Sequence, residues 1–229
     1  MLEGELCAIV GVNGIGKSTL LRTLGKVQPK LSGSVLINNK DLESYNPQEL
    51  ASQISVVLTE PIASKNMTVL ELIALGRLPY TNWLGTLTNA DKLSIKNCIE
   101  HLGLVDLKHK KCYELSDGQL QRVLIARAMA QDTPLILLDE PTTHLDLYHK
   151  VQILKLLKQL ANTHQKTVLF TTHEIDLAIQ LCDKILLLDG KENPFGQPCE
   201  LIENGAFERL FPADMIAFDA VTGSFKVKK

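Results

Sequence analysis

The residues Gly11–Thr19 have the types and spacing that enclose a phosphate group, because they read GVNGIGKST and match G-x-x-x-x-G-K-[ST]. Glycine lets the backbone approach a phosphate closely, since no Cβ obstructs it. The apolar run Leu6–Val10 before the loop reads as a buried strand, and Leu20–Leu24 after it reads as a helix. A strand–loop–helix unit directs backbone amides and the positive helix end toward an anion. The sequence therefore predicts a nucleoside triphosphate site in which Lys17 reaches the β- and γ-phosphates and Ser18 ligates Mg²⁺.

Two adjacent carboxylates end a second apolar run further along the chain. Leu135–Leu138 is aliphatic throughout, which suits a parallel strand buried on both faces, and Asp139 and Glu140 follow it directly. Ligands collect at the carboxyl ends of strands in open α/β sheets, so both acids are expected beside the phosphate loop. We expect Asp139 to hold Mg²⁺ through water and Glu140 to orient and polarise the attacking water.

Between these motifs, Leu115–Gln119 reads LSDGQ and begins a segment of good helix formers, Leu120–Ala130. Taken alone, Ser-Asp-Gly is an ordinary turn or helix cap. Together with the two motifs above, it resembles the signature motif of the ATP-binding cassette (ABC) family, which usually reads LSGGQ. Asp117 is the one departure.

The resemblance to ABC ATPases extends over nearly the whole chain. Gly11–Thr19 is similar to the family's Walker A motif and Leu135–Glu140 to Walker B. Thr143–Asp146 resembles the D-loop, and Thr171–His173, after an apolar run, resembles the family's switch histidine. The resemblance implies that His173 hydrogen-bonds the γ-phosphate.

The resemblance also implies that two copies pair head-to-tail, with each ATP between the phosphate loop of one copy and Ser116–Gln119 of the other. ATP would then close the dimer, and hydrolysis would release it. We therefore expect Glu140 and His173 to be catalytic, and we expect Ser18 and Asp139 to bind Mg²⁺. The residues expected to contact ATP are Gly11, Asn13, Gly14, Gly16, Lys17, Ser18, Thr19, Ser116, Gly118, Gln119 and Asp146.

The expected fold is α/β: a P-loop NTPase of the ABC cassette type. It has a RecA-like core lobe with a short antiparallel sheet and an inserted helical lobe. We expect one domain over residues 1–229, with the core lobe at about 1–58 and 119–229 and the helical lobe at about 59–118. Strands are expected at 34–38, 54–58, 184–188, 215–218 and 224–227. Helices are expected at 69–76, 90–103, 147–160 and 200–211.

The composition is that of an ordinary soluble domain. The 229 residues include 24 basic and 26 acidic side chains, so no basic stripe indicates nucleic-acid binding. No apolar stretch reaches transmembrane length, and no signal peptide precedes the first strand. The five cysteines are scattered without a C-x-x-C pair, which favours reduced thiols in the cytosol.

Two features of the family pattern are missing. ABC cassettes normally carry a strand before Walker A with an aromatic residue that stacks on adenine, whereas Met1–Glu5 leads straight into the Walker A strand. We therefore expect weaker ATP binding than in a chain extended by that segment. The family's Q-loop glutamine is also absent, because the chain reads Thr59-Glu60-Pro61 where it should stand.

Two interpretations of this loop remain open. Glu60 is long enough to give Mg²⁺ a hard, charged oxygen ligand. It is otherwise a solvated loop acid in a turn that Pro61 constrains. Thr59 is shorter, and we do not expect it to touch the metal without loop movement.

Other classes of P-loop protein fit less well. A GTPase needs Asn-Lys-x-Asp, and Asn38–Asp41 reads NNKD. Lys17 and Ser116 are too close for the long coiled coil of chromosome-type ABC ATPases, and ribosome-associated ABC proteins normally carry two cassettes. A transporter ATPase with a separate membrane-spanning chain remains, and in bacteria that arrangement favours importers.

The segment Thr68–Tyr80 resembles cassettes that serve ferric-siderophore, haem and cobalamin importers, although a generic amphipathic helix before a proline turn would look similar. We interpret the chain as the ATP-hydrolysing subunit of such an importer, bound to permease subunits at the cytoplasmic face of a bacterial membrane. A substrate-binding protein would be an indirect partner, and a non-transport regulatory or assembly ATPase is the alternative.

Overall fold

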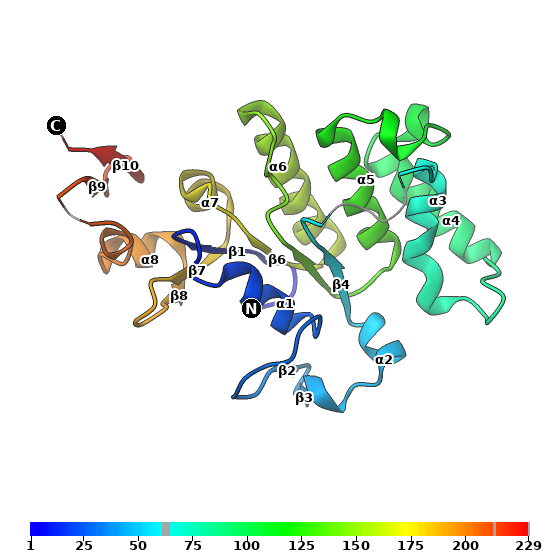
Figure 1. The fold of residues 1–229 in the computed structure, drawn as a ribbon, viewed down its shortest axis with the longest axis horizontal. Coiled ribbons are helices and arrows are strands. Elements are labelled where there is room, and N and C mark those ends of the chain that lie inside the picture. The colour runs from blue at the N-terminus through cyan, green and yellow to red at the C-terminus, as the bar shows by residue number, and fades with distance from the viewer. Residues whose placement is uncertain (61–64, 213, 229) are drawn as a thin grey trace.

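A mixed sheet of six strands forms the centre of the molecule in the computed structural model, which describes residues 1–60, 65–212 and 214–228 (Figure 1). The strand order is β4-β5-β6-β1-β7-β8, and all neighbours are parallel except β7 and β8. The strands are β1 (Leu6–Gly11), β4 (Ile54–Val57), β5 (Leu135–Leu138), β6 (Thr167–Thr171), β7 (Lys184–Leu188) and β8 (Phe195–Gly196).

Alternate residues of the central strands belong to two separate apolar clusters. In β1, Leu6, Ala8 and Val10 pack into one cluster, whereas Cys7 and Ile9 pack into the other. Successive side chains of a strand point to opposite faces, so both faces of this sheet are buried. This explains why the strands read as continuous aliphatic runs rather than as an alternating pattern.

Helices of the core lobe cover the two faces of the sheet. The helix α1 (Lys17–Leu24) contributes Leu21 to the smaller cluster, and α6 (Leu147–His164) contributes Ile153 and Leu157 to the larger one. Figure 1 shows α6 and α7 (Ile175–Leu181) on the side of the sheet opposite α1. The expected helix at 147–160 is therefore confirmed, and it continues for one further turn.

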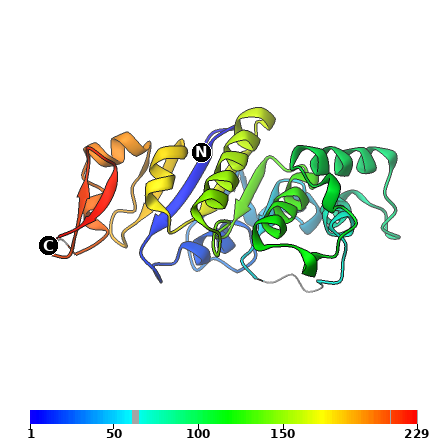
Figure 2. The ribbon, with the colours of Figure 1, turned by 90° about the horizontal axis from the view of Figure 1, so that it is seen from above.

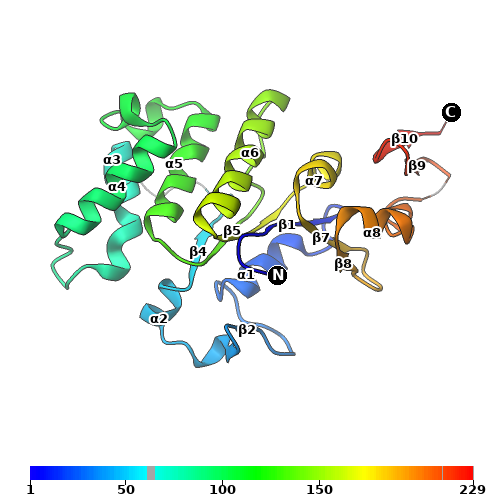
Figure 3. The ribbon, with the colours of Figure 1, turned by 180° about the vertical axis from the view of Figure 1, so that it is seen from behind.

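The helical lobe lies at one end of the molecule (Figures 2 and 3). It contains α3 (Val69–Ala74), α4 (Asn89–His101) and α5 (Asp117–Ala130), joined by the 3₁₀ turns η2 (Leu75–Tyr80), η3 (Val105–Leu107) and η4 (Cys112–Glu114). The boundary expected at residue 118 falls inside α5. Because α5 packs against α3 and α4 as well as β4, most of it belongs with the helical lobe.

The remaining elements are short. The strand expected at 34–38 is reduced to β2 (Leu36–Ile37), which pairs with β3 (Lys40–Asp41) before η1 (Leu42–Ser44) and α2 (Pro47–Ala51). The helix expected at 200–211 is divided into α8 (Pro198–Glu203) and η5 (Phe207–Arg209), because Gly205 lies between them with a φ of 64°.

The two tail strands are confirmed as an antiparallel hairpin, β9 (Ile216–Asp219) and β10 (Ser224–Val227), at the end opposite the helical lobe (Figure 3). Phe218 stacks on Phe207 with ring centroids 5.0 Å apart, and this contact attaches the hairpin to the core lobe. Within the described residues, no helix is both long and apolar enough to cross a bilayer.

Candidate functional site

The carboxyl ends of β1, β5 and β6 lie side by side, because these strands are parallel neighbours. The turn after β1 is the phosphate loop, the turn after β5 carries Asp139 and Glu140, and the turn after β6 carries His173. The parallel register therefore brings three motifs that are distant in sequence to one edge of the sheet.

The phosphate loop encloses the side chain of Lys17 at the start of α1. Gly16, at the N-cap, has a φ of 106°, a conformation that strongly favours glycine. The Lys17 ammonium donates hydrogen bonds to the carbonyl oxygens of Gly11 (2.9 Å) and Val12 (3.2 Å). Burial lowers the pKa of Lys17, and the nearby carboxylates of Glu140 and Asp139 partly oppose that shift.

A cavity of about 230 Å³ opens over this loop. It is lined by Asn13, Gly14, Gly16, Lys17, Ser18, Thr19, Glu140 and His173. All expected ATP contacts of the loop except Gly11 thus face one cavity, and both residues expected to be catalytic face it with them.

His173 connects the phosphate loop to Glu140. Its Nδ1 lies 3.2 Å from the Lys17 ammonium, and its Nε2 lies 2.6 Å from Oε1 of Glu140. An ammonium has only donors, so Nδ1 must accept and Nε2 must carry the proton that it donates to Glu140. The network thereby fixes His173 as the neutral Nε2–H tautomer in this arrangement.

Thr171, at the end of β6, orients both acidic residues. Its hydroxyl donates to Oδ1 of Asp139 and accepts from the backbone amide of Glu140, with both distances 2.8 Å. Glu140 has a φ of 47°, which costs a non-glycine residue about 1 kcal/mol or more. The Glu140 amide donates to Thr171 in this strained conformation, and the Glu140 carboxylate accepts at Oε2 from the Thr143 hydroxyl (2.9 Å).

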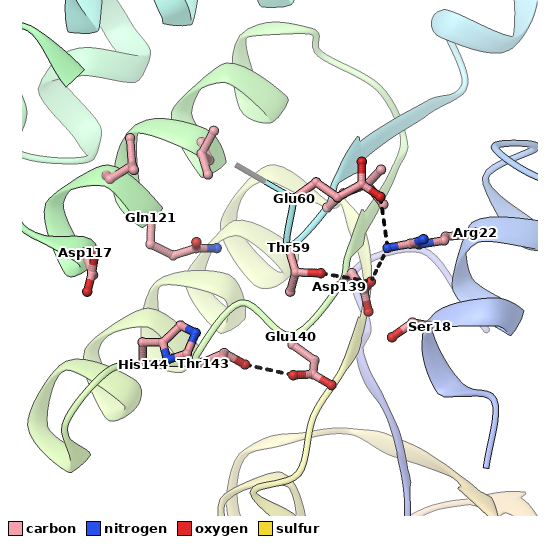
Figure 4. Close-up of a pocket in the computed structure, with 13 residues that line it drawn as sticks. Ser18, Arg22, Thr59, Glu60, Asp117, Gln121, Asp139, Glu140, Thr143 and His144 are labelled. Atoms are coloured by element: carbon pink, nitrogen blue, oxygen red, sulfur yellow. Dashed lines mark hydrogen bonds and ion pairs between the residues drawn. The ribbon is translucent and has the colours of Figure 1, made fainter. Parts of the chain in front are cut away.

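A second cavity, of about 350 Å³, lies next to the first and shares Ser18 and Glu140 with it (Figure 4). It extends from α1 and the end of β5 to the first turns of α5. Its lining residues are Ser18, Arg22, Leu58, Thr59, Glu60, Asp117, Leu120, Gln121, Leu124, Asp139, Glu140, Thr143 and His144.

The loop that lacks the family glutamine forms part of this second cavity. The Thr59 hydroxyl lies 3.4 Å from Oδ2 of Asp139, and Oε1 of Glu60 lies 3.2 Å from Nη2 of Arg22. Glu60 is therefore exposed and ion-paired with Arg22. The sequence suggested either a Mg²⁺ ligand or a solvated loop acid, and neither interpretation included this pair. Pro61 lies outside the described residues.

The oxygen donors fit a magnesium ion. Ser18 and Asp139 line the same cavity, and Asp139 is buried. Within the described part of the chain, no group of three His, Cys, Asp or Glu side chains could hold a metal on its own. Mg²⁺ commonly takes one or two protein oxygens together with substrate phosphates, and Ser18 and Asp139 offer two such oxygens.

The signature residues lie outside the cavity over the phosphate loop. Ser116 caps α5 by accepting a hydrogen bond from the Gln119 amide (3.3 Å), and the Ser116 amide donates to Oε1 of Gln119 (3.1 Å). Gly118 lies against the ring of His149. Asp146 caps α6 by accepting from the His149 amide (2.9 Å), so the structure does not bring Ser116, Gly118, Gln119 or Asp146 to the Lys17 loop of their own chain.

Sequence reasoning missed Thr171, Arg22 and Thr143. Thr143 and Thr171 are the first residues of recognised motifs and Arg22 follows one closely, but the sequence gives none of the three a role. Their contacts are made with residues that are distant in sequence or that a turn brings close. Only the fold therefore shows these contacts.

Comparison with known proteins places these motifs in a family. Residues 1–143, more than half of the chain, match the family model described as ABC transporter. The chain belongs to the ABC transporter ATP-binding family. Members of this family hydrolyse ATP.

Named relatives align over nearly the full chain. The petrobactin import ATP-binding protein of Bacillus anthracis is 34% identical over 97% of this chain and 82% of its own length. The iron(3+)-hydroxamate import ATP-binding protein of Bacillus subtilis is 33% identical over 93% of this chain and 79% of its own.

Solved structures agree with this fold. An ABC transporter described as metal-chelate type, in an inward-facing conformation, matches with a TM-score of 0.80 at 31% identity, over 91% of this chain and 78% of its own. A bacterial ABC transporter cassette solved as a dimer matches with a TM-score of 0.70 at 32% identity, over 81% and 82%.

Proposed function

We propose that this ABC ATPase drives the import of an iron complex, such as a siderophore or haem, or of cobalamin, through separate permease subunits. It would work at the cytoplasmic face of the membrane as a head-to-tail dimer. The observation that carries its ATPase role is the single network in which His173 joins Lys17 to Glu140 at the phosphate loop.

Glu140 is proposed as the general base. Its carboxylate accepts hydrogen bonds from the Thr143 hydroxyl and the His173 ring, and its backbone amide donates to the Thr171 hydroxyl. A carboxylate fixed in this way can accept a hydrogen bond from a water molecule on the γ-phosphate side and polarise it for in-line attack. His173 would orient Glu140 and donate to a phosphate oxygen when it turns from the carboxylate.

Lys17, Ser18 and Asp139 are proposed to hold the triphosphate and its metal ion. Bound phosphate would compete with the carbonyls of Gly11 and Val12 for the three donors of the Lys17 ammonium. Ser18 and Asp139 would hold Mg²⁺, which supplies positive charge next to the β- and γ-phosphates when bound. The low exposure of Asp139 strengthens its attraction for a cation.

The dimer is proposed from the position of the signature residues. Ser116, Gly118 and Gln119 lie outside the phosphate-loop cavity of their own chain, at the N-terminus of α5. In a two-fold pair they would reach the γ-phosphate held by the second copy, with Asp146 beside them. The relative solved as a dimer supports this arrangement.

The substrate class rests on the relatives. Those aligned above act in petrobactin import and iron(3+)-hydroxamate import, and the alternative of a non-transport ATPase receives no support from them. Deleting the gene should reduce cellular uptake of one radiolabelled ligand among a ferric siderophore, haem and cobalamin. Complementation with the unaltered gene should restore it, and undiminished uptake of all three ligands would contradict the proposed substrate class.

The ATPase assignment is tested with Glu140→Gln, which keeps the side-chain shape but removes the charge that polarises water. We expect ATP to bind with little change while turnover falls by about 10²-fold or more. The variant should accumulate as an ATP-bound dimer in size-exclusion chromatography. Glu114→Gln, in η4 of the helical lobe, is a control that removes an exposed carboxylate elsewhere. Undiminished hydrolysis by Glu140→Gln would remove Glu140 from the catalytic role.

A further inference from the structure

Arg22 lies between the Q-loop acid and the carboxylate of Walker B (Figure 4). Its Nη2 is 3.2 Å from Oε1 of Glu60 and 3.8 Å from Oδ2 of Asp139. Arg22 follows Ser18 by four residues on α1, so both side chains project from the same face of that helix into the second cavity.

The three charged groups do not contribute equally. The Glu60 side chain is 64% exposed, and an exposed ion pair has little effect on stability by itself. The Asp139 side chain is 1% exposed, so a nearby cation acts on it with far less screening by solvent. The main consequence of the guanidinium is therefore electrostatic and falls on the Asp139 site.

The buried portion of Arg22 points to the same conclusion. Its Nε is buried and has no hydrogen-bond partner among the described residues. A buried unpaired donor costs free energy, so this guanidinium is not positioned to satisfy all its hydrogen bonds. Its placement instead brings one positive charge to two carboxylates.

We propose that Arg22 compensates the negative charge that Glu60 adds beside Asp139 at the metal site. This inference rests on the proposed Mg²⁺–ATP site. A neutral glutamine would leave the charge of Asp139 nearly alone, whereas Glu60 adds a second negative charge. Arg22 restores the sum to one negative charge, and the pair Arg22–Glu60 thus replaces the neutral amide of the family pattern.

The proposal predicts opposite effects from its two members. Arg22→Met leaves two carboxylates and a charge of about two negative units, which attracts a divalent cation more strongly. Glu60→Gln leaves Arg22 with Asp139 and a sum near zero, which attracts the cation less. The double variant Arg22→Met/Glu60→Gln returns to one negative unit.

The measurement is the Mg²⁺ concentration that half-saturates the metal-dependent binding of a fluorescent non-hydrolysable ATP analogue. Mn²⁺ binding followed by electron paramagnetic resonance is the second readout, and neither requires turnover. We expect half-saturation about tenfold lower for Arg22→Met and about tenfold higher for Glu60→Gln, with the double variant within about twofold of the unaltered protein. The differences should shrink in high salt, because Glu60 is exposed.

Two control variants separate charge from other effects. Lys30→Met removes a cation that pairs with Asp41 (4.0 Å) away from this cavity, and it should leave half-saturation unchanged. Arg22→Lys keeps the charge but loses the planar guanidinium group. Its half-saturating Mg²⁺ concentration should stay within about threefold of that of the unaltered protein. If Arg22→Met folds poorly, Arg22→Gln against the unaltered protein removes the same charge and keeps a polar side chain.

Several outcomes would overturn the proposal. A shift of the half-saturating Mg²⁺ concentration in the same direction by Arg22→Met and Glu60→Gln would show a structural role. So would a double variant whose shift equals the sum of two such shifts in one direction. Equal half-saturation in all four proteins would show that the pair has no influence on the metal. In contrast, absence of any Mg²⁺-dependent nucleotide binding in the unaltered protein would contradict the proposed function itself.

Discussion

The hydroxyl of Thr171 has two partners that both belong to the turn after β5. It donates to Asp139 and accepts from the amide of Glu140, and it is fully buried. One small side chain therefore fixes the direction of a metal-site carboxylate and the backbone of the proposed base. Both residues act only if their carboxylates point correctly, so the geometry of the site depends on this hydroxyl.

Replacing Thr171 with valine tests that dependence, because valine keeps the shape and removes the hydroxyl. The Glu140 amide would lose its partner, which should cost about 1–3 kcal/mol of stability. Turnover should fall by about tenfold or more, since both carboxylates gain freedom. The measurements are chemical unfolding and steady-state ATPase rates.

A matched control is Thr133→Val, which removes another buried hydroxyl that donates to Leu135 O (2.9 Å), away from the cavities. It should lower stability by a similar amount and leave turnover unchanged. If the two variants lost stability and activity alike, Thr171 would be a core residue without influence on the site.

For single residues, the sequence predicted which side chains gather at the edge of the sheet better than it predicted the contacts between them. The placement of Lys17, Asp139, Glu140 and His173 at one edge follows from strand ends that the apolar runs already marked. The contact between Thr171 and Asp139 could not be predicted from the sequence. The two residues are 32 positions apart, and the contact depends on the direction of their side chains. The positive φ of Glu140 was equally hidden, since nothing in a Leu-Asp-Glu run indicates it.

Among the elements, η2 and α4 are joined to α5 by the side chain of Arg77. Its Nε donates to Asp91 on α4 (2.8 Å), and its Nη1 donates to Ala130 O at the end of α5 (2.9 Å). Gly76 allows the close approach, because a Cβ there would lie 2.2 Å from the carbonyl oxygen of Arg127. The segment Thr68–Tyr80, which resembles that of iron importers, thus packs against the other helices of the helical lobe.

The Arg77–Asp91 pair predicts a pH-dependent stability. Hydrogen bonds from Thr88, together with Arg77, lower the pKa of Asp91 to about 2 from its ordinary 3.8. A carboxyl with a lowered folded pKa stabilises the protein above the unfolded pKa, and this stability is lost as pH falls from about 4 to 2. Asp91→Asn should therefore cost about 2 kcal/mol at pH 7 and progressively less below pH 4.

Urea unfolding at pH 7 and at pH 3 measures this difference. Asp106→Asn, which removes an exposed carboxylate from η3 of the same lobe, serves as the control and should change stability little at either pH. A cost for Asp91→Asn that stayed constant across the two pH values would show that shape, not charge, makes the contact.

Sequence patterns located most elements and misplaced their ends. Apolar periodicity predicted α6, and the segments expected at 69–76 and 90–103 correspond to α3 and α4; the structure adds Thr68, Thr88 and Asp146 as their N-cap residues. The tail helix was predicted too long, since Gly205 interrupts it and only the fold decides whether a glycine ends a helix. The lobe boundary expected at residue 118 falls within α5, which packs against elements of both lobes.

For the whole molecule, the proposed head-to-tail pair predicts that two substitutions fail at different steps. Lys17→Ala deletes the cation that faces the phosphate and should weaken nucleotide binding by the single chain. Ser116→Arg should leave that binding nearly unchanged but block ATP-induced dimer formation and hydrolysis, because a bulky side chain would fill the shared site. Equilibrium binding and light scattering with ATP separate the two steps.

Ser116→Arg also removes the N-cap of α5, at a cost of about 1 kcal/mol. Asn46→Arg removes the comparable cap of α2 and is the matched control, which should leave dimer formation intact. If Lys17→Ala and Ser116→Arg gave the same defect in binding by the single chain, the head-to-tail arrangement would be incorrect.

The pairing of β1 with β6 has a consequence for biosynthesis. Leu6 is in register with Val168, so the first strand leaves the ribosome long before its partner exists. At about 5–20 residues per second, the ribosome needs on the order of 10 to 30 s to complete that partner. During this interval the apolar stretch Leu6–Val10 has no sheet to join, and a nascent chain in this condition is a natural client of holding chaperones. The core lobe can close only near the end of translation, whereas the helical lobe, built from contacts closer in sequence, can form earlier.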